Sequence, residues 1–197
     1  PETQRLTVSA RRLPVDEIAA MLAAERFDLV IDATHPYAAS ITESIAKACA
    51  RTRTQRWRLL RGASETSTDA VMVESTAQAI SFLSGTEGRI LLTTGSKELV
   101  AYAGMADFAE RVWVRVLPMK ASLDACAAAG LSPSHIIAMQ GPFSEEMNVA
   151  MLKSVGAKWL VTKDGGDAGG FAAKNSAAQK AGARLLVIGR PAQEQGM

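Results

Sequence analysis

The densest group of reactive side chains in this 197-residue chain runs from Asp32 to Tyr37, directly after the apolar segment 27–32. It contains a carboxylate, the Thr34 hydroxyl, the His35 imidazole and the Tyr37 phenol. An imidazole titrates near neutral pH, so His35 has the ordinary properties of an acid-base group. A structural role is the alternative, in which Asp32 or Thr34 caps the following helix and His35 is a hydrogen-bonded histidine between domains.

A second polar segment, Thr93-Thr94-Gly95-Ser96-Lys97, lies at the end of the apolar run 89–95 and leads into a helical pattern. Hydroxyls and a lysine around a glycine can cradle a phosphate, because backbone and side-chain donors then converge on the anion. The segment is neither a Walker A sequence nor a GxGxxG fingerprint. A glycine turn capped by Thr or Ser explains it equally well.

A third segment, Gln140-Gly141-Pro142-Phe143, follows the apolar run 135–140. Its Gly-Pro pair requires a tight exit from the strand, which a turn explains without any function. The Gln140 amide and the Phe143 ring are therefore the candidates for contact with a ligand.

The fourth segment begins with Lys163-Asp164-Gly165-Gly166 and continues to Gly170, with four glycines in the six positions after Asp164. Glycine lets the backbone approach a ligand closely, at an entropic cost that a simple connection need not carry. Lys163 and Lys174 could reach phosphate or carboxylate groups there. For Lys174 the alternative is a solvated side chain.

The elements around these segments follow an α/β pattern. Strands are predicted at 27–32, 55–60, 70–74, 89–95, 112–117, 135–140, 158–163 and 184–189. Helices are predicted at 15–25, 38–50, 76–84, 96–103, 121–129, 144–155 and 171–181. Several strands are apolar at successive positions, which is typical of strands covered on both faces. The alternation with helices predicts parallel sheets in doubly wound, Rossmann-like domains.

A break in composition at 61–69 predicts a domain boundary, with domains at 1–64 and 65–197. The second domain contains a nearly complete set of Rossmann-like strands. The first is predicted to be incomplete, because it lacks an initial strand, glycine-rich turn and helix. Ligands bind beyond the carboxyl ends of the strands in such sheets, so all four polar segments fall where a crevice is expected.

Composition excludes several classes of protein. Lys and Arg number 22 against 20 Asp and Glu, so the net charge of +2 gives no general attraction to nucleic acid. No apolar stretch approaches the ~20 residues needed to cross a bilayer, and we predict a cytoplasmic protein. Cys49 and Cys126 lie in alanine-rich helical patterns without metal-ligand spacing, which favours buried thiols. Trp57, Trp113 and Trp159 lie in strand patterns and are predicted in the core.

Taken together, five blocks resemble the precorrin-6A reductase family. They are DLVIDATHPYAASIT (28–42), LLTTGSKEL (91–99), IAMQGPFSEEMN (137–148), LVTKDGGDAGG (160–170) and VIGRP (187–191). The blocks occur in the family's order and span nearly the whole chain. The resemblance implies two Rossmann-like domains facing a cleft that holds a reduced nicotinamide cofactor and a macrocyclic tetrapyrrole.

The implied reaction reduces a double bond of precorrin-6A to give precorrin-6B, with a hydride from NADPH, in cobalamin biosynthesis. If the enzyme supplies a proton, His35 is the first candidate donor and Tyr37 the second. The residues assigned to the cofactor are Thr34, Thr93, Thr94, Gly95, Ser96 and Lys97. Those assigned to the tetrapyrrole substrate are Gln140, Gly141, Phe143, Lys163, Asp164, Gly165, Gly166 and Lys174. We expect no metal ligands and no nucleic-acid or membrane partner, and a monomer is compatible with the sequence.

The chain departs from the family pattern in three respects. Gly165 stands where a serine is common, and Ala173 stands before Lys174 where a glutamate is common. The family's N-terminal glycine loop has no counterpart in this sequence. The alternatives are a cobalt-precorrin-6A reductase using NADH, another tetrapyrrole-pathway enzyme such as a methyltransferase, or a tetrapyrrole-binding protein without catalysis.

Overall fold

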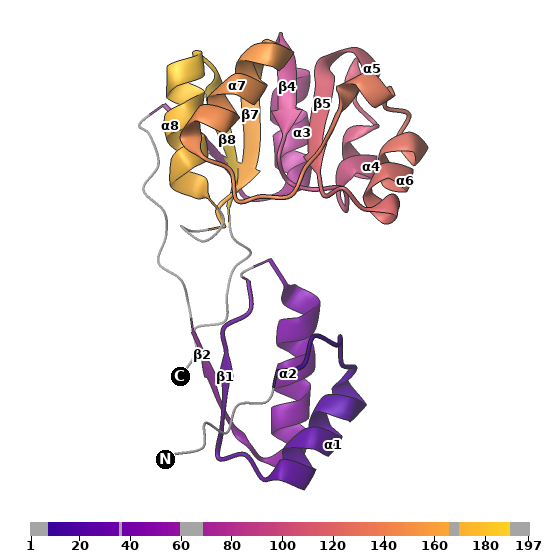
Figure 1. The fold of residues 1–197 in the computed structure, drawn as a ribbon, viewed down its shortest axis with the longest axis vertical. Coiled ribbons are helices and arrows are strands. Elements are labelled where there is room, and N and C mark those ends of the chain that lie inside the picture. Colours follow the sequence, from indigo (N-terminus) through magenta and orange to yellow (C-terminus); the bar gives the residue numbers. More distant parts are fainter. Residues whose placement is uncertain (1–7, 36, 60–68, 166–169, 190–197) are drawn as a thin grey trace. The chain divides into compact units, whose positions relative to one another are not determined.

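The computed structural model describes residues 8–35, 37–59, 69–165 and 170–189. These residues form two compact units (Figure 1). The N-terminal unit comprises the described residues up to Leu59, and the C-terminal unit those from Asp69 to Gly189. No helix in these ranges is long and apolar enough to cross a membrane.

The N-terminal unit is a parallel βαβ arrangement preceded by a helix. Its elements are α1 (Val15–Glu25), β1 (Leu29–Asp32), α2 (Ala39–Thr52) and β2 (Gln55–Arg58). Leu29 pairs with Gln55 and Asp32 with Arg58. The apolar stripes of α1 and α2 pack on each other and on Val30, around a small core that contains Leu22 and Cys49. One face of the two strands therefore supports the helices.

The opposite face of β1 and β2 is apolar and open in the described part of the N-terminal unit. Ile31 pairs with Trp57, and both side chains are mostly exposed, Trp57 to 58%. The prediction that Trp57 lies in the core is wrong, because side chains alternate along a strand and the helices cover only the face that carries Val30. Trp159 is buried and Trp113 is half-buried, as strand positions in a covered sheet.

The C-terminal unit contains a six-stranded parallel sheet in the order β3-β8-β7-β4-β5-β6. The strands are β3 (Val71–Val73), β4 (Arg89–Leu92), β5 (Val112–Val116), β6 (Ile136–Ala138), β7 (Ala157–Lys163) and β8 (Arg184–Ile188). The helices are α3 (Thr76–Ser84), α4 (Leu99–Tyr102), α5 (Phe108–Arg111), α6 (Lys120–Ala128), α7 (Glu145–Val155) and α8 (Phe171–Ala181), with a 3-10 turn at Pro133–His135. The predicted α/β class with parallel sheets is confirmed.

Helices cover both faces of this sheet (Figure 1). Helices α3 to α6 enclose one core, to which β4 contributes Ile90 and Leu92. Helices α7 and α8 enclose the second core, to which β4 contributes Leu91. The alternation of inward positions explains why these strands are apolar at successive residues. Cys49 and Cys126 are buried free thiols, as the sequence predicted.

The sheet contains a point at which the chain changes sides. Strands β4 and β7 are neighbours, but the chain leaves β4 toward the face of α4 and leaves β7 toward the face of α8. Opposite exits open a crevice between the carboxyl ends of the two strands, where α/β sheets bind their ligands. The topology therefore places a candidate site beside Thr93 and Thr162.

Candidate functional site

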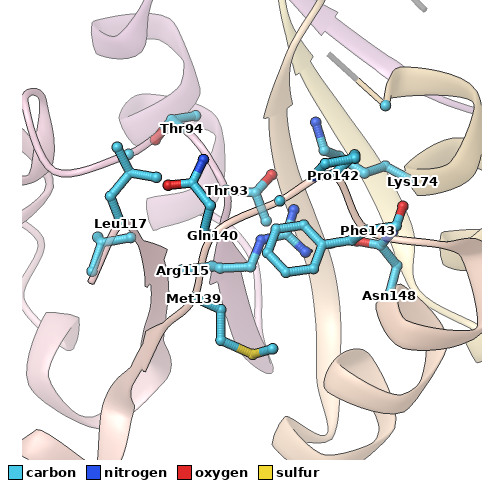
Figure 2. A pocket seen from close by; sticks show the side chains of 14 residues that line it. Thr93, Thr94, Arg115, Leu117, Met139, Gln140, Pro142, Phe143, Asn148 and Lys174 are labelled. Atoms are coloured by element: carbon cyan, nitrogen blue, oxygen red, sulfur yellow. Dashed lines mark hydrogen bonds between the residues drawn. The ribbon is translucent and has the colours of Figure 1, made fainter. Parts of the chain in front are cut away.

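A cavity of about 560 Å³ lies at the carboxyl ends of β4, β5 and β6 (Figure 2). Every residue that lines it belongs to the C-terminal unit. The lining residues are Thr93, Thr94, Gly95, Arg115, Val116, Leu117, Met139, Gln140, Gly141, Pro142, Phe143, Asn148, Gly170 and Lys174. Polar groups from three strand ends and two helices thus converge on one space.

A polar row crosses the sheet beneath the cavity. Leu92 pairs with Val161 on β7 and with Val114 on β5, so the next positions along these strands, Thr93, Thr162 and Arg115, are aligned. Side chains alternate along each strand, and these positions face the layer of α7 and α8. The row lies at the change of direction between β4 and β7.

Arg115 is the charged member of this row and is only 7% exposed. Its Nη1 donates to Asn148 Oδ1 at 2.7 Å and contacts Met151 Sδ at 3.4 Å, and its guanidinium lies 4.1 Å from the centre of the Phe143 ring. Burial lowers the pKa of Arg115 to about 10, so the side chain remains protonated at neutral pH. The strand therefore holds a permanent positive charge against the cavity wall.

Lys174 brings a second cation to the cavity from α8. Its Nζ donates to Thr162 Oγ1 at 3.2 Å, which anchors the amine to the polar row. Burial, followed by the nearby charge of Arg115, lowers the pKa of Lys174 to about 8. At neutral pH the cavity carries two positive charges that repel each other.

The remaining wall is apolar. Leu117 and Met139 line the cavity although each side chain is about two-fifths exposed, at 44% and 39%. The Phe143 ring and Pro142 continue this surface toward α7, as Figure 2 shows. A ligand in this space meets apolar surface and cationic groups together.

The segment after β4 is shaped by its glycine. Gly95 has φ +82°, which non-glycine residues rarely adopt, and no atom lies within 4 Å of where its Cβ would be. The Thr93 hydroxyl donates to Val161 O at 2.8 Å, and Ser96 Oγ lies 3.4 Å from Ser122 Oγ. The Thr93 hydroxyl hydrogen is thus used within the sheet, which leaves only its oxygen to accept a bond from a ligand.

The segment after β7 is tied to the same region by ion pairing. Lys163 donates to Glu98, and Glu98 also accepts a hydrogen bond from Thr76 Oγ1 at 2.5 Å. Burial raises the pKa of Glu98, but the hydrogen bonds from Lys163 and Thr76 outweigh it and the net shift is downward. Asp164 is buried, and its N–H donates to Ile188 O at 3.2 Å. Lys163 therefore positions the loop that carries Glu98.

In the N-terminal unit, the buried Asp32 carboxylate organises the loop after β1. It accepts from Thr34 N at 3.1 Å, Thr34 Oγ1 at 2.8 Å and Arg58 Nη1 at 2.6 Å, and Arg56 Nη1 lies 3.4 Å away. Burial raises the pKa of Asp32, but the hydrogen bonds from Thr34 and Arg58 and the charge of Arg58 together lower it by more. The net shift is downward, and the carboxylate is ionised at neutral pH. The loop is held by a network, and Asp32 is its hub.

Thr34 is fully engaged in that network. Its hydroxyl donates to Asp32, accepts from Arg58 Nη1 at 2.6 Å and lies 2.8 Å from Thr42 Oγ1. A hydroxyl has one hydrogen and two acceptor positions, so these three contacts use its capacity. These contacts tie Thr34 into the network around Asp32. The N-cap of α2 is Ala38 and has no side-chain cap hydrogen bond, so the helix cap that the sequence offered for Asp32 or Thr34 is not formed.

His35 and Tyr37 lie together at the carboxyl end of β1. The Tyr37 N–H donates to His35 Nδ1 at 3.3 Å, and the two ring centres are 5.6 Å apart. Because Nδ1 accepts this bond, the neutral imidazole carries its hydrogen on Nε2. His35 is exposed and Tyr37 is half-buried.

No group of three or more His, Cys, Asp and Glu side chains with metal-binding geometry occurs among the residues that the structure describes.

Across the whole chain, residues 1–197, the sequence matches the family of precorrin-6x reductases CbiJ/CobK. The chain belongs to this family. The resemblance inferred from the five sequence blocks is therefore confirmed.

Three relatives show how much of a CbiJ/CobK protein is matched. The Cobalt-precorrin-6A reductases of Methanothermobacter thermautotrophicus, Priestia megaterium and Salmonella typhimurium are 36%, 31% and 33% identical over 83%, 99% and 93% of this chain. The matches cover 54%, 78% and 71% of those proteins, so the chain spans about half the length of the first. A solved structure of the CobK precorrin-6A reductase superposes with a TM-score of 0.73 at 24% identity, over 92% of this chain and 72% of that one, which shows the shared fold.

The structure places about half of the predicted CbiJ/CobK site residues around the cavity. The lining includes Thr93, Thr94, Gly95, Gln140, Gly141, Phe143 and Lys174. The residues outside this lining are Ser96, Lys97, Lys163, Asp164 and Gly165 in the C-terminal unit, and Thr34, His35 and Tyr37 in the other. Gly166 lies outside the described residues.

Sequence reasoning missed Arg115 and Asn148. The signal for Arg115 was present, because it is a single charged residue within the apolar strand Val112-Trp113-Val114-Arg115-Val116. In a strand covered on both faces this charge is buried, and a buried charge needs a partner. Asn148 had no comparable signal. Its amide faces Arg115 only because α7 packs on that side of the sheet.

Proposed function

We propose that this chain reduces a double bond of a precorrin-6A-type macrocycle, with a hydride from NADPH, as a step of cobalamin biosynthesis in the cytoplasm. The observation that carries the proposal is the cavity at the change of direction between β4 and β7, in a chain that belongs to the precorrin-6x reductase family. Its apolar wall and two cations suit a flat ring with carboxylate side chains.

The residues after β4 fit a dinucleotide cofactor. Open space beside Gly95 at φ +82° lets a phosphate approach the backbone, and Thr94 lines the same cavity. We assign Thr93, Thr94, Gly95, Ser96 and Lys97 to cofactor contacts, with Thr93 restricted to accepting a bond. A bound nicotinamide supplies the hydride, which is chemistry that no side chain of the chain supplies.

The chain itself positions the macrocycle and controls protons. Gln140, Gly141 and Phe143 line the ring site, and Lys174 contacts an anionic side chain of the substrate. We also assign to substrate contacts the residues Lys163, Asp164, Gly165 and Gly166. For the proton that reduction requires, His35 is the first candidate donor, through Nε2, and Tyr37 is the second. This assignment rests on the acid-base chemistry of the imidazole and the phenol.

A second candidate substrate is the cobalt form of the macrocycle. The three relatives described above all bear the name Cobalt-precorrin-6A reductase, whereas proteins from Sinorhizobium and Mycobacterium tuberculosis named Precorrin-6A reductase are 29% identical over 89% and 93% of this chain. The identities favour the cobalt substrate, and NADH is then the alternative donor.

An anaerobic assay tests the proposal and separates the candidates. The full chain is mixed with metal-free or cobalt precorrin-6A and with NADPH or NADH, and the nicotinamide absorbance and the macrocycle spectrum are followed together. Equimolar loss of reduced nicotinamide and conversion of the macrocycle would support reduction and identify the preferred pair. Binding of the macrocycle with no loss of nicotinamide in any combination would favour a tetrapyrrole-binding protein without catalysis.

A further inference from the structure

The positive charge of Arg115 has no carboxylate partner within the described part of the chain. Its contacts there are the neutral Asn148 amide, the Met151 sulfur and the Phe143 ring. A guanidinium has five N–H donors and stays charged, so burial without an anion is costly unless another group supplies the charge. The side chain is 93% buried and lines the cavity, where such a group could enter.

The surrounding groups direct the guanidinium rather than neutralise it. Asn148 Oδ1 holds Nη1, and the Asn148 amide is itself fixed by a bond to Ser144 O at 2.8 Å. The central carbon of the guanidinium also lies 4.1 Å from the centre of the Phe143 ring. A guanidinium held by an acceptor at one nitrogen and packed against an aromatic ring has little freedom to turn, so its remaining N–H donors are preorganised.

Lys174 adds charge to the same space. It is close enough that the charge of Arg115 contributes to lowering its pKa. An anion in the shared cavity would be attracted by both cations. The pair therefore favours an anion over a neutral ligand.

The apolar wall selects among anions. Leu117, Met139 and the Phe143 ring lie around the same cavity and offer apolar contact that a small inorganic anion would not use. A large apolar ring with a carboxylate at its edge can contact the apolar wall and the two cations at the same time. A carboxylate of the macrocycle and a phosphate of the cofactor both present anionic oxygens that a guanidinium can bind. The test of Arg115 therefore measures the binding of both ligands.

We propose that Arg115 is a binding residue that receives a carboxylate side chain of the macrocycle, with Lys174 as its partner and Asn148 as the group that orients it. The assignment deepens the proposed function and rests on it for the identity of the ligand. It predicts that polycarboxylate tetrapyrroles bind the C-terminal unit through this pair, whether or not reduction follows.

The test measures fluorescence titrations of the full chain with uroporphyrin, whose side chains are all carboxylates, and separately with NADPH. Arg115→Gln removes the charge but keeps an N–H donor for Asn148, so the buried amide is not left unpaired. Arg115→Lys keeps the charge and loses the fork. Arg184→Gln is the matched control, because Arg184 lies over the Trp159 ring at the opposite end of the strands.

Arg115→Gln should weaken uroporphyrin binding by roughly 10- to 100-fold, and Arg115→Lys by less, while NADPH binding and the Arg184→Gln control stay within about twofold. Unchanged uroporphyrin affinity in Arg115→Gln would overturn the proposal. Loss of NADPH affinity instead would assign the anion to a cofactor phosphate and overturn the carboxylate assignment. If uroporphyrin binding depends on Arg115 but precorrin-6A is never reduced, the binding site stands and the proposed reductase function fails.

Discussion

Arg115 Nη1 donates to Asn148 Oδ1 at 2.7 Å, so a neutral amide on α7 is the hydrogen-bond acceptor for a buried cation on β5. A carboxylate at position 148 would satisfy the guanidinium from within the protein. The neutral amide instead orients the cation and leaves its charge for a ligand. The proposed binding of an anion in the cavity depends on this relationship.

Asn148→Asp should convert that relationship into an internal ion pair. The new carboxylate would compete with any bound anion, so the affinity for uroporphyrin should fall by roughly 10-fold. The Tm of the free protein should stay equal or rise, because the buried cation gains a partner. Titration and calorimetry on the same variant check both results. Unchanged affinity would show that ligands do not use Arg115.

Lys174 should make ligand binding depend on pH. Its pKa is lowered to about 8, chiefly by burial, whereas Arg115 at about 10 stays charged and Glu145 on α7 is paired with Lys180. Uroporphyrin affinity should therefore fall several-fold as the pH rises from about 7 to about 9, as Lys174 loses its proton. Lys174→Met should bind more weakly at neutral pH and show a flat profile. A profile that still falls in this variant would assign the titration to another group.

In the free protein the lowered pKa of Lys174 makes stability rise with pH, whereas the affinity for uroporphyrin falls. The folded pKa of Lys174 lies below its ordinary value of 10.5, so the cost of the buried charge is fully present below about 8 and is lost as the pH rises toward 10.5. Lys174→Met should raise the Tm by about 2–4 °C at neutral pH, and the difference should shrink at alkaline pH. Differential scanning calorimetry at several pH values checks the sign; a Tm lowered at neutral pH would contradict it.

Gly95 should matter for the cofactor beyond its effect on stability. Gly95 and Gly130 share φ +82°, and no atom lies within 4 Å of a Cβ at either position. Alanine at either site should therefore cost about 1–2 kcal/mol of backbone strain without a clash. Only Gly95→Ala should also weaken NADPH binding, by roughly 5- to 10-fold. Equal NADPH affinity in the two variants would remove the segment after β4 from the cofactor site.

Asp32 should be essential to the N-terminal loop. Asp32→Asn removes the charge that Arg58 and Arg56 share, and breaking a buried pair in this way costs about 3 kcal/mol. Amide hydrogen exchange in β1 and β2 should accelerate by roughly 100-fold. The control is Glu43→Gln, whose exposed pair with Lys47 lies on the surface of α2 and should leave the exchange unchanged. Equal protection in both variants would show that the network does not hold the loop.

Much of the fold could be predicted from the sequence because the apolar runs are local signals. Each of the eight predicted strands corresponds to an observed one, and no end is displaced by more than three residues. Helix α5 was missed because Phe108–Arg111 is only one turn long. The helix predicted at 96–103 begins at Leu99, since the preceding residues form the loop around Gly95. Short elements such as these are set by packing rather than by periodicity.

The site was only partly predictable. The polar residues after β4 and β6 could be found because they interrupt apolar runs at strand ends. The alignment of Thr93, Thr162 and Arg115 depends on which strands are neighbours, and the order β7-β4-β5 is a property of the folded sheet. Trp57 shows the same limit, because a strand covered on one face and a strand covered on both look alike over four residues.

The most direct measurement of the central claim is a single turnover with NADPH that carries deuterium at the transferred position. The full chain is mixed anaerobically with precorrin-6A, or its cobalt form, and the macrocycle is analysed by mass spectrometry. Hydride transfer predicts a product that has gained one deuterium from the cofactor, with Arg115→Gln slower at subsaturating macrocycle. A macrocycle recovered without label while NADPH remains unoxidised would contradict the account.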